Sequence, residues 1–78
     1  MITADKLALL TNMPAAMLSM GIQQAGYKGD SFTGAKFLGL TNGNQFCYMC
    51  TYKVEGGIDS CKVFVTYNPT KDQVSVDY

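Results

Sequence analysis

The sequence predicts a single α+β domain, residues 1-78, in which one or two N-terminal helices pack on a four-stranded antiparallel β-meander. Three observations lead to this prediction. The first third of the chain is rich in helix formers, the remainder forms four β-rich runs, and turn signals separate those runs. Short connections of this kind make consecutive strands neighbours in a sheet.

Two helices are expected before the first strand. Thr3 is a suitable N-cap, and Asp5 lies in the first turn, where the helix dipole favours an acid. Residues 12–14 (Asn-Met-Pro) indicate a stop and a restart, because asparagine caps helices and proline suits the first turn of a new one. The second helix is expected to run to about Ala25, with Gly26 ending it.

Four strands follow a loop over residues 28–33. They are expected at 35–41, 45–54, 59–67 and 73–78. Asn42-Gly43 is a strong signal for a hairpin turn, and Gly56-Gly57 suits a second tight turn. Asn68-Pro69-Thr70-Lys71 indicates a third turn, which completes the meander.

The turn at Gly56-Gly57 sets the register of the central hairpin. A two-residue turn there pairs Cys50 with Val63 and leaves Cys50 and Cys61 as diagonal neighbours. Slipping the register by two residues would oppose the two cysteines directly, but would place Glu55 where a positive φ is wanted. The double glycine therefore favours the first register, with two free thiols in the core.

Strand alternation then sorts the sheet into two faces. The side chains that alternate towards the helices form the expected core face: Phe46, Tyr48, Cys50, Tyr52, Val54, Cys61, Val63, Val65, Tyr67, Val74, Val76 and Tyr78.

The opposite face is expected to be mostly polar and solvated. It nevertheless carries Met49 and Phe64 opposite each other, with Cys47 two residues along. Leu38 and Leu40 join this cluster if the first hairpin closes with a two-residue turn, and they enter the core if its turn has three residues. The sequence leaves both alternatives open.

Cys47-x-x-Cys50 raises the question of a metal or redox site. Residues three apart on a strand point to opposite faces, whereas a redox pair needs both thiols together at a helix N-terminus. A zinc site needs four ligands, and the chain has three cysteines and no histidine. The acids are scattered and form no pair across a cleft. We therefore expect no enzyme activity, no metal and no cofactor.

Charge and cysteine usage limit the class of partner. Six lysines, with no arginine, balance six acids to a net charge of zero, which makes nucleic acid an unlikely partner. An odd number of cysteines fits poorly with a secreted disulfide framework. The longest apolar run is far below the roughly 18 residues that span a bilayer. A reducing, cytoplasmic setting with no membrane partner is expected.

Apolar groups outside the expected core suggest protein binding. Met13, Met17 and Met20 share one flank of the second helix, a pattern found both in cores and on adaptable binding surfaces. The last strand, QVSVDY, has no internal proline or lysine and would be an edge open to another chain. The candidate contact residues are Leu38, Leu40, Cys47, Met49, Phe64, Val74, Val76, Tyr78, Met13, Met17 and Met20.

The predicted function is a small non-catalytic protein-binding module that forms a homodimer, binds another protein, or both. It would be of the accessory or inhibitor type that phages and mobile elements encode. The alternative is a small-ligand or single-stranded nucleic-acid binder, in which Tyr48, Tyr52 and Tyr67 stack bases on the sheet. Against that alternative, the tyrosines fall on the expected core face, and no basic residues surround them.

Overall fold

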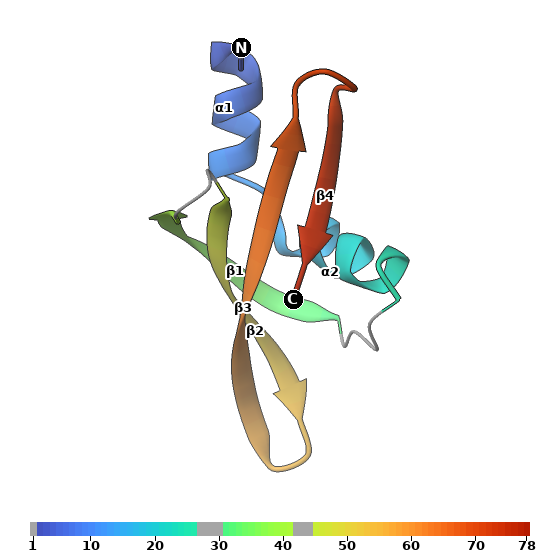
Figure 1. The fold of residues 1–78 in the computed structure, drawn as a ribbon. Coiled ribbons are helices and arrows are strands. Elements are labelled where there is room, and N and C mark those ends of the chain that lie inside the picture. Colours follow the sequence, from blue (N-terminus) through green and yellow to red (C-terminus); the bar gives the residue numbers. More distant parts are fainter. Residues whose placement is uncertain (1, 27–30, 42–44) are drawn as a thin grey trace.

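The computed structural model describes residues 2–26, 31–41 and 45–78, and it shows two helices followed by an antiparallel sheet (Figure 1). The strand order β1-β2-β3-β4 is that of a meander, which confirms the predicted α+β class and topology. The elements are α1 (Ala4–Thr11), α2 (Ala15–Gln24), β1 (Phe32–Leu40), β2 (Phe46–Val54), β3 (Gly57–Asn68) and β4 (Gln73–Asp77).

The ends of both helices follow from local chemistry. The Thr3 side chain accepts a hydrogen bond from the Lys6 N–H, 3.2 Å away, and so caps α1. Asn12 ends α1, and α2 begins directly after Pro14. Gly26 follows α2 with a φ of 93°, a left-handed conformation that favours glycine. Neither helix, in the part of the chain that is described, is long and apolar enough to cross a bilayer.

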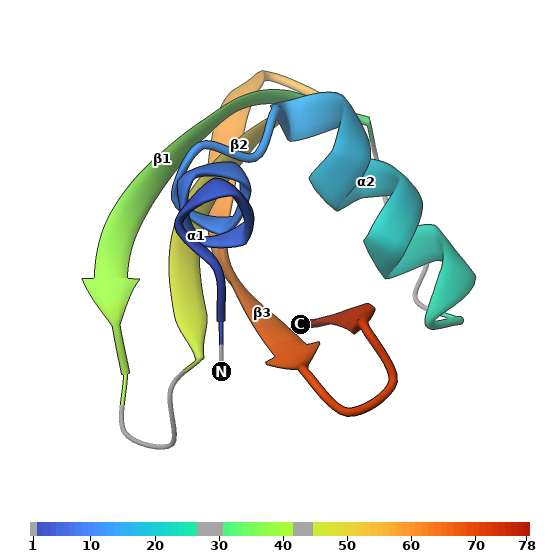
Figure 2. The same ribbon diagram turned by 90° about the horizontal axis from the view of Figure 1, so that it is seen from above.

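The core lies on the concave face of a curled sheet. Figure 2 shows the sheet wrapping round one side of α1, with α2 beside it. α2 packs against both β1 and β4, and the buried Ser19 hydroxyl accepts a 2.6 Å hydrogen bond from the Phe32 N–H. The buried apolar side chains of this core are Leu10, Met13, Leu18, Ile22, Phe32, Phe46, Tyr48, Cys50, Val63 and Val65.

Tyr48 joins the sheet to the junction between the two helices. Its ring is buried in the core, and its hydroxyl donates a hydrogen bond to the Leu10 carbonyl. The same hydroxyl accepts a 3.0 Å hydrogen bond from the Met13 N–H. Burial raises the pKa of Tyr48, and the bond from Met13 partly offsets that rise. One side chain therefore satisfies two backbone groups where α1 ends and α2 has not yet begun.

The first strand begins earlier than the sequence predicted. β1 starts at Phe32, so the expected loop through Thr33 is wrong at its end. Phe32 is buried and lies opposite Tyr52, and its N–H is held by Ser19. An irregularity between Phe32 and Gly34 lets the strand continue despite its polar and small residues.

The first hairpin closes with three residues between its flanking positions. Asn42-Gly43, the predicted turn, lies outside the described residues. On either side of it, Leu40 pairs with Phe46, and the Thr41 N–H donates a 2.8 Å hydrogen bond to the Gln45 carbonyl. A second irregularity, between Phe37 and Gly39, makes Leu38 an extra residue in the ladder. The bulge separates the two leucines, and both remain exposed.

The central hairpin adopts the register that the sequence disfavoured. Val54 lies opposite Gly57, and Cys50 lies directly opposite Cys61, so the expected pairing of Cys50 with Val63 is wrong by two residues. In the observed turn Gly56 takes the positive φ, at 91°, and Glu55 does not need one. A shift of two residues keeps every side chain on its predicted face. The middle of the predicted core face is therefore buried as expected, whereas Val54, Val74 and Tyr78 at its ends are exposed, so the prediction is wrong for these three.

The far half of this hairpin projects from the core as an arm (Figure 1). β1 accompanies β2 only as far as Tyr52, and β4 accompanies β3 only from Phe64 to Asn68. The molecule is accordingly elongated, 44 × 23 × 21 Å, with a radius of gyration of 12.6 Å, against about 11.5 Å for a compact chain of this length. Ile58 on the arm is 70% exposed.

Candidate protein-binding surface

An open groove lies between α2 and β4, and we call it the α2–β4 groove. It has a volume of about 210 Å³, and an adjoining hollow of about 230 Å³ continues it towards Ala25 and Ser75. The groove is lined by Met13, Met17, Met20, Gly21, Gln24, Val74 and Val76. The structure thus brings together the methionine flank of the second helix and the valines of the last strand, which the sequence analysis proposed separately.

The groove exposes apolar side chains and carries no charge among its described lining residues. Met17 is 43% exposed, Met20 is 58% exposed and Val74 is 39% exposed, whereas Met13 belongs to the core. Gln24 supplies the one polar side chain among the described residues of its lining. Flexible methionine side chains next to branched valines form a surface that adapts to another apolar surface.

Gly21 sets the distance between α2 and β4. A Cβ atom at this position would lie 2.5 Å from a methyl carbon of Val76 and 2.8 Å from its Cβ. The helix therefore lies directly against the strand at this point. This contact corrects the expectation of a fully open edge: β4 is an edge strand, but α2 covers part of it.

Gly21→Ala is expected to destabilise the fold by about 2 kcal/mol. The new methyl group forces α2 and β4 apart at a cost of about 3 kcal/mol, and the better helix propensity of alanine returns about 1 kcal/mol. Urea unfolding followed by circular dichroism measures the difference.

Two controls accompany this substitution. Gly57→Ala adds a methyl group where nothing lies within 4 Å, and it should change stability little. In a Val76→Ala background, Gly21→Ala should cost less, because the clashing methyl groups are gone. A Gly21→Ala variant as stable as the parent would contradict the close contact.

The solvent face of the sheet offers less apolar surface than the sequence suggested. Met49 lies between Lys36 and Lys62 in the ladder, and Phe64 lies opposite Cys47, so the expected pairing of Met49 with Phe64 is wrong. Cys47 is only 5% exposed. Met49 and Phe64 are themselves half-buried. Two apolar groups of this face are well exposed: Leu38, next to Gly39 in the bulge opposite Cys47, and Ile58, which lies opposite Lys53 on the arm.

Leu40 lies in a different place, in an apolar hollow of about 360 Å³ beside α1. The hollow is lined by Ile2, Leu7, Leu40, Phe46, Tyr67 and Pro69. The sequence analysis did not single out Ile2 or Leu7 for this hollow, because their meeting with Leu40 depends on how α1 lies across the end of the sheet.

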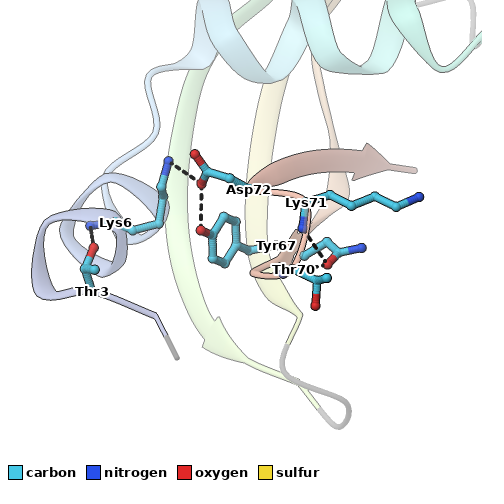
Figure 3. A network of polar contacts seen from close by, with 7 residues as sticks. Thr3, Lys6, Tyr67, Thr70, Lys71 and Asp72 are labelled. Atoms are coloured by element: carbon cyan, nitrogen blue, oxygen red, sulfur yellow. Dashed lines mark hydrogen bonds and ion pairs between the residues drawn. The ribbon is translucent and has the colours of Figure 1, made fainter.

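A polar network holds α1 to the β3–β4 turn beside that hollow (Figure 3). The Tyr67 hydroxyl donates a 2.6 Å hydrogen bond to Asp72 Oδ1, and Lys6 Nζ lies 3.4 Å from the same oxygen. The pKa of Asp72 is lowered, mainly by the hydrogen bond from Tyr67 and to a smaller extent by Lys6. Asn68 Oδ1 accepts bonds from the Thr70 and Lys71 N–H groups, which confirms the predicted third turn.

Tyr78 lies beside Cys61 and Tyr52. Tyr78 is more than half exposed. The three cysteines are free thiols, and Cys47 and Cys50 lie on opposite faces of β2, as predicted. Burial raises the pKa of Cys50 to about 12 and also raises that of Cys61, where a hydrogen bond with Tyr78 acts in the opposite direction.

Two of the three tyrosines that were expected to stack bases are engaged within the fold. Tyr48 is buried and its hydroxyl is occupied, so it is not available to a base. Tyr67 is engaged by Asp72, with Lys6 Nζ 5.4 Å from its ring centroid. Across residues 2–26, 31–41 and 45–78, no three acidic, cysteine or histidine residues gather where they could hold a metal ion.

Comparison of the chain with protein-family models, with curated proteins and with solved structures gives no match.

Proposed function

We propose that this chain is a non-catalytic protein-binding module that associates with a second copy of itself through the α2–β4 groove, in a cytoplasmic setting. The observation that carries the proposal is that Met17, Met20 and Val74 lie exposed along one charge-free groove. An exposed cluster of this kind is more stable when a second apolar surface covers it.

A second copy is the occupant that the charges favour. The chain has a net charge of zero, so two copies do not repel each other. The described groove lining holds no charged group that would select an acidic or basic partner. A two-fold axis beside β4 would place the methionines of each copy against the same groove of the other.

The required area shows which residues have to take part. A standard interface buries about 800 Å² on each partner, which is about 15% of the 5285 Å² surface of this chain. The five residues of β4 form an edge only about 17 Å long. The flank of α2 must therefore join the contact, and Met17 and Met20 would lie at its centre.

The solvent face is the weaker candidate. Met49 and Phe64 are half-buried, and Lys36 and Lys62 flank Met49 in the ladder. The more exposed Leu38 and Ile58 lie apart from them, in the bulge of β1 and on the arm. Lysine stems cover apolar surface while their ammonium groups keep the face wet. This arrangement favours solvent over a partner at the sheet surface, in contrast to the charge-free groove.

Met17→Lys is expected to weaken self-association at least tenfold. The lysine places an ammonium group in an apolar contact. The free-energy cost of doing so is greater than the free-energy equivalent of a tenfold change in affinity, about 1.4 kcal/mol. Light scattering across a wide dilution range gives the concentration at which dimer becomes monomer. The matched control is Gln23→Lys, which adds the same charge to an exposed position of α2 outside the described groove lining.

Three results would contradict the proposal. The parent chain could be a monomer at every concentration, or Met17→Lys could leave its dissociation unchanged. A third variant, Phe64→Lys, tests the solvent face: if it dissociates the dimer and Met17→Lys does not, the contact lies on that face instead.

A further inference from the structure

Cys50 and Cys61 face each other across the central hairpin. They are direct partners in the β2–β3 register, and both side chains point to the concave face. Directly opposed residues in an antiparallel pair have Cα atoms about 4.5 or about 5.5 Å apart, depending on the type of pair. A disulfide bridges Cα atoms about 4.4–6.8 Å apart, so either type of pair satisfies this requirement.

The two thiols differ in their access to solvent. Cys50 is fully buried, whereas Cys61 is half-buried. The reason lies in the neighbouring strand: β4 pairs with β3 only from Phe64 onwards, so what lies beside Cys61 on that side is the side chain of Tyr78, which is itself more than half exposed. A small reagent can therefore reach Cys61 first, and Cys50 only through Cys61.

We propose that Cys50 and Cys61 form an oxidation site that closes to a cross-strand disulfide when the chain meets a small-molecule disulfide of the oxidised glutathione class. The thiolate of Cys61 attacks one sulfur of the oxidant, the S–S bond of the oxidant breaks, and one small thiol leaves with a proton. The Cys50 sulfur then attacks Cys61 Sγ, and the second small thiol leaves with the proton from Cys50. The protein loses two hydrogens, and the oxidant is reduced to two thiols.

Burial makes this reaction slow at neutral pH. The nucleophile is the thiolate, and desolvation raises the pKa of Cys61, so little thiolate is present. The rate of bridge formation should therefore rise with pH. This behaviour distinguishes the pair from an activated redox dithiol, whose thiolate is already formed near neutral pH.

The bridge would lock the base of the projecting arm. It would join β2 and β3 at the point where the arm begins, because the pairing of β1 with β2 extends only as far as Tyr52. A cross-link closing this short loop should raise the Tm by about 10 °C. The inference stands apart from the proposed function, since it uses neither the α2–β4 groove nor a second chain.

The test uses the folded chain and excess oxidised glutathione at mildly alkaline pH. After free thiols are trapped by alkylation, mass spectrometry should show one free thiol, loss of two hydrogens, and a linked peptide that contains Cys50 and Cys61. Dithiothreitol should restore three free thiols. Cys47→Ser is the matched control from the same strand, and it should form the same bridge because Cys47 lies on the other face.

Two further variants separate the steps. Cys50→Ser should stop at a mixed disulfide on Cys61, because the resolving thiol is missing. Cys61→Ser should leave Cys50 free, because the entry thiol is missing. The unfolded chain, treated in parallel, shows that the oxidant is active.

Other outcomes would overturn the inference. They are a bridge that includes Cys47, a disulfide between two chains, a parent chain that stops at the mixed disulfide, or three free thiols in the folded chain while the unfolded chain reacts.

Discussion

Replacing Tyr48 by phenylalanine is expected to lower the free energy of unfolding by about 3 kcal/mol. The substitution keeps the buried ring and removes only the hydroxyl, which bonds the Leu10 carbonyl and the Met13 N–H. Both backbone groups are buried where the helices meet, so each loses its partner without gaining water. An orphaned buried group costs about 1–3 kcal/mol, and a loss of this size lowers the Tm by roughly 15 °C.

Tyr67→Phe is the matched control for this substitution. Its hydroxyl also forms a hydrogen bond, but the partner, Asp72, is exposed and is hydrated when the bond is lost. Tyr67→Phe should therefore lose much less stability than Tyr48→Phe in thermal and urea unfolding. Equal losses for the two variants would contradict the special position of Tyr48.

Raising the pH from 9 to 11 is expected to cost the folded state about 2 kcal/mol through Cys50 alone. The pKa of Cys50 is raised from 9.0 to about 12. Burial is the largest cause, and the neighbouring thiols of Cys61 and Cys47 add to it. The unfolded chain releases this proton near pH 9, and the folded chain holds it until about pH 12. In that window the unfolded state binds fewer protons, so stability falls as the pH rises, by up to about 1.4 kcal/mol per pH unit.

The measurement is urea unfolding at several pH values in the presence of a reductant, which keeps the thiols free. The tyrosines also ionise in this range, so the comparison is between variants and not between pH values alone. Cys50→Ala should show a shallower fall of stability with pH than the parent chain, whereas Cys47→Ala should keep the steep fall. Identical slopes for the parent and Cys50→Ala would contradict the burial argument.

The pattern of helix caps and turns accounts for how well the fold could be predicted. The caps at Thr3 and Gly26 and the turn at Asn68 depend on residues a few positions apart, and all three are confirmed. The start of β1 could not be predicted in this way. Phe32 is ordered by Ser19 and Tyr52, which are distant in sequence, so local propensity carried no signal.

The register of the central hairpin shows a different limit. Two adjacent glycines allow a positive φ at either position, and the alternative registers keep the same core face. The observed turn uses Gly56 for the positive φ and leaves Gly57 at the start of β3. The disfavoured alternative was therefore the correct one, and with it Cys50 came to oppose Cys61.

The candidate binding surface could be predicted residue by residue, but not as a surface. Helix periodicity placed Met17 and Met20 on one flank but did not decide between core and surface, and Val74 followed from its place on the last strand. Their meeting in one groove depends on Gly21, which lets α2 lie against Val76. The expected cluster on the solvent face changed for a different reason, because the two-residue shift of the central hairpin moved Phe64 from Met49 to Cys47.

The sequence by itself determined the class of fold, the order of its elements and the side of each strand that faces the helices. Those properties depend on turn residues, caps and a period of two, which are local. Only the tertiary structure decided which strand positions lie opposite each other, how α2 covers part of the β4 edge, and which apolar groups share a groove. The register depends on a turn in which either of two glycines can take the positive φ, so local sequence leaves it open. The helix–strand contacts join residues far apart in the chain, where the packing of one side chain, such as Tyr48, or the absence of one, at Gly21, selects a single arrangement.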